Sequence, residues 1–113
     1  MRVIDSPIIL GGKDCTEIDG VTWQGTKIAA RCDEGFRYKN GVNEDRIVIA
    51  KDLFAVIDGM GGHGNGDLAA QYLAEELARV DLQKEEAVEK MIARARLRMQ
   101  RLLPGAGVTV QIA

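Results

Sequence analysis

The spacing of hydrophobic and polar residues changes several times along the chain, and each spacing predicts an element. Residues 3–10 predict a first strand, which Pro7 places at a sheet edge. Residues 11–24 hold three glycines and predict a loop. In residues 26–32 apolar and polar side chains alternate, which predicts a half-buried strand. The polar, glycine-containing residues 33–43 predict another loop.

Residues 46–50 and 53–57 are runs of mostly β-branched and aromatic residues separated by Lys51 and Asp52. Two such runs with a two-residue connection predict a β-hairpin, although Lys-Asp is not the favoured turn pair and a longer loop stays possible. Both faces of this hairpin are mostly apolar, which favours a sheet covered on both sides. In the expected pairing one face holds Ile47, Ile49, Phe54 and Val56, and the other holds Val48, Leu53 and Ile57.

Two amphipathic helices and a last strand are predicted after the hairpin. Residues 58–66 hold five glycines and precede the first helix, whose apolar side we expect to contain Leu68, Tyr72, Leu73, Leu77 and Val80. The second helix is expected over about 82–103 and ends at Pro104. Its expected apolar residues are Val88, Met91, Ile92, Ala95, Met99 and Leu102. Residues 108–112 predict a strand.

Composition narrows the class of protein. The chain has 113 residues, 46% of them hydrophobic, which suits one domain with a modest core. A net charge of -2 argues against a general nucleic-acid binder. No apolar run has the roughly 20 residues of a membrane helix, so no membrane association is expected. Cys15 and Cys32 have no CxxC spacing, and we therefore expect a cytoplasmic protein.

The hairpin register brings two carboxylates together. If Ala50 pairs with Leu53, then Asp45 lies directly opposite Asp58, with Cβ atoms about 5 Å apart. At an effective dielectric constant of about 20 two such charges repel by about 3 kcal/mol. Protonation of one carboxylate or a bound cation would offset this repulsion.

Further oxygen ligands lie at the same end of the hairpin. Glu44 adds a third carboxylate, and Gly59 adds a backbone carbonyl. Carboxylate, carbonyl and water oxygens suit Mg²⁺ or Mn²⁺. Residues 43–45 could instead be a solvated loop, but the following glycines favour a ligand that the backbone approaches closely.

Three motifs occur in a fixed order. NEDR occupies Asn43–Arg46, FAVIDGMGGHGNGDLAA occupies Phe54–Ala70, and GAGVTV occupies Gly105–Val110. Together they resemble the type 2C metal-dependent serine/threonine phosphatases, and the DGMGG form resembles their bacterial members. The resemblance extends from about residue 26 to 113, so the chain is expected to be a single domain, 1–113, similar to the N-terminal half of that phosphatase domain.

The resemblance implies an α+β fold, namely a partial α-β-β-α sandwich in which two long helices pack on an antiparallel β-sheet. It also implies a binuclear Mn²⁺ or Mg²⁺ centre that activates water to attack phosphoserine or phosphothreonine in a protein substrate. By motif, Glu44 would orient water or bind one metal, and Asp45 would bind the same metal. Asp58 would bridge both metals, and the Gly59 carbonyl would complete one ligand shell. The implied catalytic residues are thus Glu44, Asp45 and Asp58.

Two departures from the family pattern affect this expectation. The position of the family's phosphate-binding arginine, four residues before Glu44, is Asn40. Arg37 or Lys39 could bind phosphate instead, although lysine lacks the bidentate fork of arginine. The family's later metal-binding aspartates have no counterpart, since no aspartate follows Asp81. We therefore expect a truncated domain that is weak or inactive alone, and a homo-oligomer that covers its open strand edge.

Other interpretations remain. The chain could be a catalytically inactive remnant that acts as a binding module. Residues 59–64 also match GxGxxG, but a dinucleotide-binding unit would need a parallel strand after Asp81, where a helix is predicted. His63 could donate a proton to a leaving group or could face solvent. The arginines of the second helix could bind phosphopeptide or nucleic acid, or form a solvated face.

Overall fold

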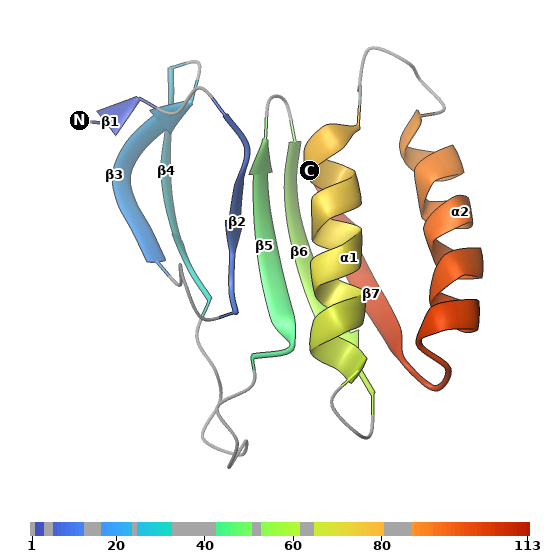
Figure 1. Cartoon of the computed structure of the whole chain (residues 1–113). Helices are drawn as coiled ribbons and strands as arrows, with labels where there is room; N and C mark the ends of the chain where they lie inside the picture. Colours follow the sequence, from blue (N-terminus) through green and yellow to red (C-terminus); the bar gives the residue numbers. More distant parts are fainter. Residues whose placement is uncertain are drawn as a thin grey trace.

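The structure is a computed structural model that describes residues 2–3, 6–12, 17–23, 25–32, 43–50, 53–61, 65–80 and 87–113. The elements in chain order are β1 (Arg2–Val3), β2 (Ile8–Leu10), β3 (Glu17–Trp23), β4 (Thr26–Arg31), β5 (Asp45–Ala50), β6 (Leu53–Met60), α1 (Asn65–Arg79), α2 (Ala87–Leu102) and β7 (Gly107–Ile112). Figure 1 shows these elements along the chain.

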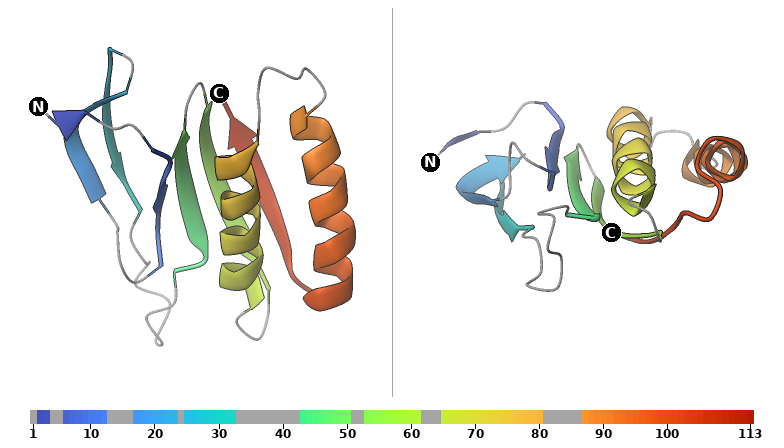
Figure 2. Two further views of the ribbon diagram at one scale, coloured as in Figure 1. Left: turned by 45° about the horizontal axis from the view of Figure 1, so that its top comes forward. Right: turned by 60° about the horizontal axis from the view of Figure 1, so that its bottom comes forward.

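The strands form two sheets, and the helices lie on one side of the larger one. The four-stranded sheet is antiparallel in the order β2-β5-β6-β7. The smaller sheet has the order β1-β3-β4, with β1 parallel to β3. Helix α1 lies over one face of the larger sheet, in roughly the direction of β5 and β6, and α2 lies beside α1, as the views in Figures 1 and 2 show. The combination of one antiparallel sheet, one small mixed sheet and two helices confirms the expected α+β class.

The predicted hairpin is confirmed with its register. Ala50 pairs with Leu53 and Asp45 pairs with Asp58. The two strands are therefore joined by two residues, Lys51 and Asp52, which lie outside the described residues. Strand β6 continues to Met60, beyond the predicted end at residue 57, and pairs there with β7. The reason is that β7 supplies hydrogen-bonding partners to the first residues of the glycine-rich segment.

Two hydrophobic cores lie on opposite faces of the four-stranded sheet. The larger core lies between the sheet and the helices, and it includes Val48, Ile57, Leu73 and Met91. The smaller core joins β2 and β5 to the three-stranded sheet, and its buried residues are Leu10, Ile18, Trp23, Cys32 and Ile49. The expectation of a sheet with apolar cover on both sides therefore holds for β5.

Both predicted helices are confirmed as α1 and α2, although the expected start of the second at about residue 82 lies outside the described residues. Part of each predicted apolar side is wrong. Leu68 in α1 is 51% exposed and Leu102 in α2 is 66% exposed. The other buried positions of α1, besides Leu73 and Leu77, hold small residues, namely Gly66, Ala69, Ala70 and Ala74. Small side chains let a helix approach a sheet closely. The alanines of α1 therefore face the sheet, and Leu68 faces solvent.

The N-terminal predictions need correction as well. In place of one strand over 3–10, the structure has β1 at Arg2–Val3 and β2 at Ile8–Leu10, and these two short strands belong to different sheets. The predicted loop over 11–24 contains the seven-residue strand β3. Its pairing with β4 is irregular between Ile18 and Val21, and Gly20 has a φ of 65° there. A glycine in a strand marks such a bulge as readily as it marks a loop, which is why counting glycines misplaced this segment.

Among the described residues, neither helix combines the length and the apolar character needed to cross a membrane.

Candidate functional site

Asp45 and Asp58 face each other at the open end of the β5–β6 hairpin. Both side chains are on the sheet face away from α1, and both are exposed. The pKa of the Asp45 carboxyl lies above its usual value. The first cause is that surrounding atoms remove part of its water although the residue is exposed, and the next is that Asp58 is negative and hydrogen-bonds to it. The charge of Glu44 adds to this rise in pKa, and Arg46 opposes it. The pair therefore attracts either a proton or a cation.

Glu44 directs its carboxylate to the opposite side, toward the first turn of α1. One carboxylate oxygen, Oε2, is buried and has no hydrogen-bond partner in the described part of the chain. It lies against Gly66, where a Cβ atom would clash with it. The positive end of the helix dipole favours a carboxylate at this position, but the unpartnered oxygen still requires a donor or a cation.

Close backbone packing holds these groups in place. The amide of Gly59 donates a hydrogen bond of 3.0 Å to the carbonyl oxygen of Glu44. A Cβ atom at Gly59 would clash with the carbonyl of Gly66 and would lie 2.5 Å from that of Glu44. Both obstacles are backbone atoms, so side-chain rotation cannot relieve them. The glycines thus allow the end of β6, the start of α1 and the segment before β5 to meet.

Arg46 supports the site from the helix side of the sheet. Its side chain is only 5% exposed and donates hydrogen bonds to the carbonyl oxygens of Asn43 at 2.5 Å and Asp45 at 2.8 Å. Its Nε also donates to Gln71 Oε1 at 2.8 Å. A buried arginine is tolerated when its donors are satisfied in this way. The arginine thereby ties the backbone before β5 to the middle of α1.

Asn43 closes the same segment from within. It is buried, its Oδ1 accepts a hydrogen bond of 3.0 Å from the amide of Asp45, and its Nδ2 donates one of 3.1 Å to the carbonyl oxygen of Cys32. The Cys32 thiol contacts the Asp45 carbonyl oxygen at 3.4 Å. These bonds fix the direction in which Asp45 leaves the backbone, so the alternative of a solvated loop over 43–45 does not describe Asn43.

The donors fit a divalent cation in chemistry but form only part of a site. Asp45 and Asp58 offer oxygen ligands on one face, and Glu44 has an unpartnered buried oxygen on the other. In residues 43–50, 53–61, 65–80 and the other described ranges, no three His, Cys, Asp or Glu side chains converge as a metal-binding group. The two aspartates therefore fit one cation only with further ligands from water or from backbone carbonyls such as that of Gly59.

Three of the residues weighed from the sequence cannot be placed. Arg37 and Lys39, the expected phosphate-binding residues, lie outside the described residues, and so does His63. Conversely, the structural roles of Asn43 and Arg46 were not predicted from the sequence. The signal for Arg46 was its position, because it shares the strand face of Val48 and Ala50, which is otherwise apolar.

Thr109 is a further residue that sequence reasoning did not single out. It pairs with Asp58 across β6 and β7, so Asp45, Asp58 and Thr109 form one row across three strands. Its hydroxyl can donate or accept a hydrogen bond. The GAGVTV motif predicted the strand β7, but only the register of β7 on β6 shows that Thr109 lies beside Asp58.

Comparison with known proteins gives a partial relationship. A segment of 55 residues, 49% of this chain, is 42% identical to the serine/threonine protein phosphatase PstP of Mycobacterium tuberculosis, in strain CDC 1551 / Oshkosh and equally in strain ATCC 25618 / H37Rv. That segment covers 10% of the length of the phosphatase. No family model matches the chain, and no solved structure matches it. The relationship therefore supports a phosphatase-like origin for about half of the chain.

Proposed function

We propose that this chain carries the N-terminal part of a metal-dependent serine/threonine phosphatase site, in which Asp45 and Asp58 hold Mn²⁺ or Mg²⁺. The observation that carries the proposal is the pairing of these two carboxylates in register on adjacent strands. The similarity of about half of the chain to a serine/threonine phosphatase supports it.

In this proposal each residue has a separate task. Asp45 and Asp58 bind the cation together with the Gly59 carbonyl. The Glu44 carboxylate is directed toward Gly66 on the other side of the sheet, so it does not join this pair as a ligand and needs a donor of its own, such as water. When bound, the cation supplies an activated water nucleophile and neutralises charge on a phosphate. Arg46 and Asn43 hold the backbone that carries the carboxylates. A phosphoserine or phosphothreonine protein would be the substrate, with Arg37 or Lys39 as phosphate ligands.

Metal binding is tested by thermal unfolding of the 113-residue chain with and without Mn²⁺. Metal at a hundred times its dissociation constant stabilises a fold by about 2.7 kcal/mol. Asp58→Asn should remove most of this gain because the pair then loses one carboxylate. Glu89→Gln, at an exposed position of α2, removes the same charge elsewhere and should retain the gain. An equal gain in wild type and Asp58→Asn would contradict the proposed site.

Catalysis is tested with an aryl phosphate and a phosphothreonine peptide in the presence of Mn²⁺. We expect little or no turnover by the chain alone, because a two-metal mechanism needs more ligands than Asp45 and Asp58 provide. Robust turnover that is lost in Asp45→Asn would show that the chain is a complete catalyst. If the chain shows neither turnover nor stabilisation by Mn²⁺, the alternative of a non-catalytic binding module is favoured. The incomplete group of metal ligands among the described residues supports that alternative.

The homo-oligomer expected from the sequence stays a prediction. Phe54 and Val56 are 37% and 54% exposed on the sheet face away from α1, and exposed apolar surface of this kind often joins copies of a chain. We propose that a second copy covers it. Light scattering at micromolar concentration should then give at least twice the 12.3 kDa chain mass. A monomer that stays at this mass would contradict the proposal.

A further inference from the structure

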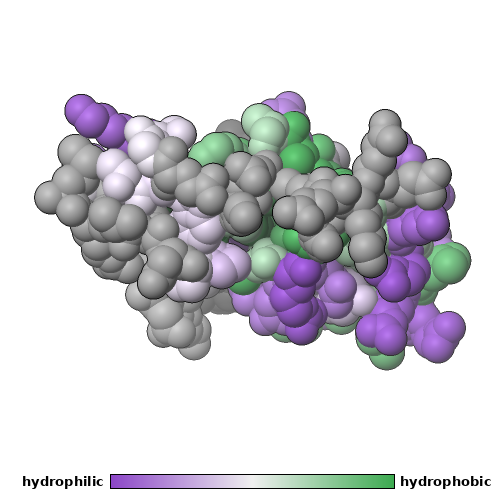
Figure 3. All heavy atoms as spheres, turned by 90° about the horizontal axis from the view of Figure 1, so that it is seen from above, coloured by the Kyte–Doolittle hydropathy of each residue, from purple (hydrophilic) through white to green (hydrophobic). Residues whose placement is uncertain are grey.

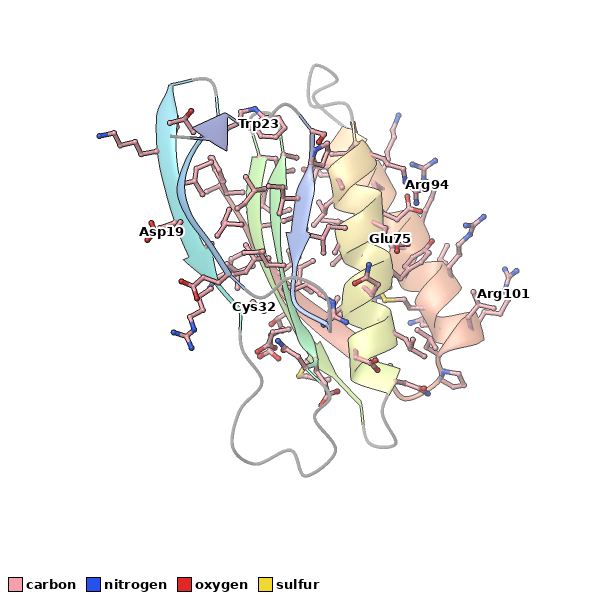
Figure 4. All side chains as sticks on the ribbon, turned by 60° about the vertical axis from the view of Figure 1, so that its left-hand side comes forward. Asp19, Trp23, Cys32, Glu75, Arg94 and Arg101 are labelled. Atoms are coloured by element: carbon pink, nitrogen blue, oxygen red, sulfur yellow. The ribbon has the colours of Figure 1, made fainter. Side chains whose placement is uncertain are left out.

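Helix α2 has a basic outer surface in a chain that is acidic as a whole. The helix has five basic residues and one acidic residue, whereas the chain has a net charge of -2. Within the described part of the chain, none of its four arginines forms an ion pair. Two of them, Arg94 and Arg101, extend away from the sheets in Figure 4. Their charges are therefore available to a partner.

Three of these arginines line a groove between α1 and α2. Two adjoining hollows, of about 320 Å³ and about 220 Å³, share Tyr72 and Arg98 as lining residues. We call them together the arginine groove, which is defined by Leu68, Tyr72, Arg94, Arg98, Arg101 and Leu102. The spacing of four and three residues between the arginines places them along one side of α2.

The arginine groove is apolar as well as basic. Leu68 and Leu102 are more than half exposed at one end of it, and Leu97 is 65% exposed at the other. Figure 3 shows the hydrophilic surface over the helices with separate hydrophobic patches within it. A merely solvated helix face does not need exposed leucines beside its arginines. This combination is typical of a surface that binds a chain with both charged and apolar groups.

Among the residues that the structure describes, the arginine groove contains little negative charge of its own. Glu76 is the acidic residue that lines it, and its carboxylate pairs with Arg79 on the same helix at 3.0 Å. The three groove arginines therefore form a positively charged surface, and the neighbouring Glu76 carboxylate is already paired with Arg79. An arginine guanidinium pairs with a carboxylate through two parallel hydrogen bonds.

We propose that the arginine groove binds an acidic protein segment that carries bulky apolar side chains. Carboxylates of the segment pair with Arg94, Arg98 and Arg101, and its apolar side chains enter the hollows beside Tyr72 and the leucines. A protein segment is favoured over nucleic acid because the exposed leucines have no role with a phosphate backbone and because the net charge is negative. The groove lies on the helix side of the sheet and Asp58 on the other, so this binding does not depend on the metal site.

The test measures fluorescence anisotropy of a labelled peptide against the full chain. The peptide has 14 residues, rich in glutamate, with leucines spaced four apart as on one side of a helix. Arg98→Glu should weaken binding by about tenfold, because it removes a charge-assisted pair and adds repulsion. Arg96→Glu makes the same change on the same helix but lines a different hollow, beside β7. It should weaken binding by less than about twofold.

A second pair of variants tests the apolar part. Leu102→Ser should weaken binding about threefold or more, in line with the loss of part of a buried leucine contact. Ile112→Ser removes an exposed apolar side chain outside the groove and should leave binding unchanged. All four positions are exposed, and circular dichroism with thermal melting confirms that each variant is folded.

Several results would overturn the proposal. If Arg98→Glu and Arg96→Glu weakened peptide binding equally, the effect would come from the overall charge of the chain and not from the arginine groove. Equal or tighter binding of a peptide in which lysine replaces glutamate would contradict the acidic partner. Tighter binding of a DNA duplex or of anionic lipid vesicles than of the peptide would assign the groove to another class of ligand. Absence of peptide binding at millimolar concentration would contradict the groove altogether.

Discussion

The two faces of the four-stranded sheet differ in what covers them. On the face toward α1, Val48, Ala55 and Ile57 are fully or almost fully buried. On the opposite face of the same strand β6, Phe54 and Val56 remain exposed. The helix face is dry and supplies most of the hydrophobic stabilisation. The other face carries Asp45 and Asp58, and it is the one that a ligand can reach.

The second face is covered only in part. The three-stranded sheet packs over β2 and β5, where Leu10 and Ile49 are buried. Over β6 and β7 an apolar hollow of about 580 Å³ remains, with Phe54, Val56 and Ile112 in its lining. The face toward α1 therefore supplies most of the stability, and the opposite face is the accessible one. Substitutions on the two faces should change the free energy of unfolding by very different amounts.

The largest difference is expected between two neighbours on β6. Ile57 is 0% exposed and Val56 is 54% exposed. Ile57→Ala should lower the free energy of unfolding by about 2–5 kcal/mol because it leaves a cavity in the packed core. Val56→Ala should change it by less than about 0.5 kcal/mol. Urea unfolding monitored by circular dichroism measures both values.

Similar losses for both variants would mean that the open face is covered in solution, as it would be in a homo-oligomer. The division between the two faces would then hold only for an isolated chain, and repeating the measurement at lower protein concentration would distinguish the two cases.

A second test concerns the carboxylate end of the sheet. Gly59→Ala should destabilise the chain by about 1–3 kcal/mol, because its Cβ would clash with backbone atoms of Gly66 and Glu44. Gly107 also lies in a strand of this sheet, but a Cβ there meets no atom within 4 Å. Gly107→Ala should therefore have little effect. Thermal unfolding of the two variants checks the prediction, and equal melting temperatures would show that the tight approach of β6 and α1 is absent.

The smallest expected effect is electrostatic and has the opposite sign. The pKa of Asp45 is raised in the folded chain, so the folded state binds its proton more tightly than the unfolded state. Its contribution to stability is complete below the unfolded pKa of about 3.9 and is lost as the pH rises through the folded value. Asp45→Asn should therefore raise the melting temperature at pH 7 in the presence of a chelator, and much less at pH 3.5.

Because Asp45 is exposed, solvent screening keeps this gain below about 1 kcal/mol. Asp19→Asn is the control, since Asp19 is exposed in the other sheet and accepts a hydrogen bond from the amide of Gly20 that an asparagine retains. A lower melting temperature for Asp45→Asn at pH 7 would show that the folded chain stabilises the charged form of Asp45, which contradicts a raised pKa.

The sequence by itself determined the hairpin and the pair of carboxylates. Two apolar runs separated by two residues predict a register that places Asp45 opposite Asp58. A longer loop also stayed open from the sequence, and the structure confirms the two-residue register. The sequence also determined both helices, β4 and β7, because alternation and helical spacing are local signals. The GxGxxG alternative lost its basis in the same way, since the strand before these glycines belongs to an antiparallel hairpin.

Only the tertiary structure decided which helix residues are buried and what surrounds the carboxylates. Leu68 faces outward because three alanines give α1 a closer approach to the sheet. Residues 17–23 became a strand because β4 offered hydrogen-bonding partners, which a count of glycines cannot reveal. Arg46 reaches Gln71 in α1, and Glu44 meets Gly66. These contacts join residues more than 20 positions apart, so they arise from the packing of α1 on β5 and not from any local pattern.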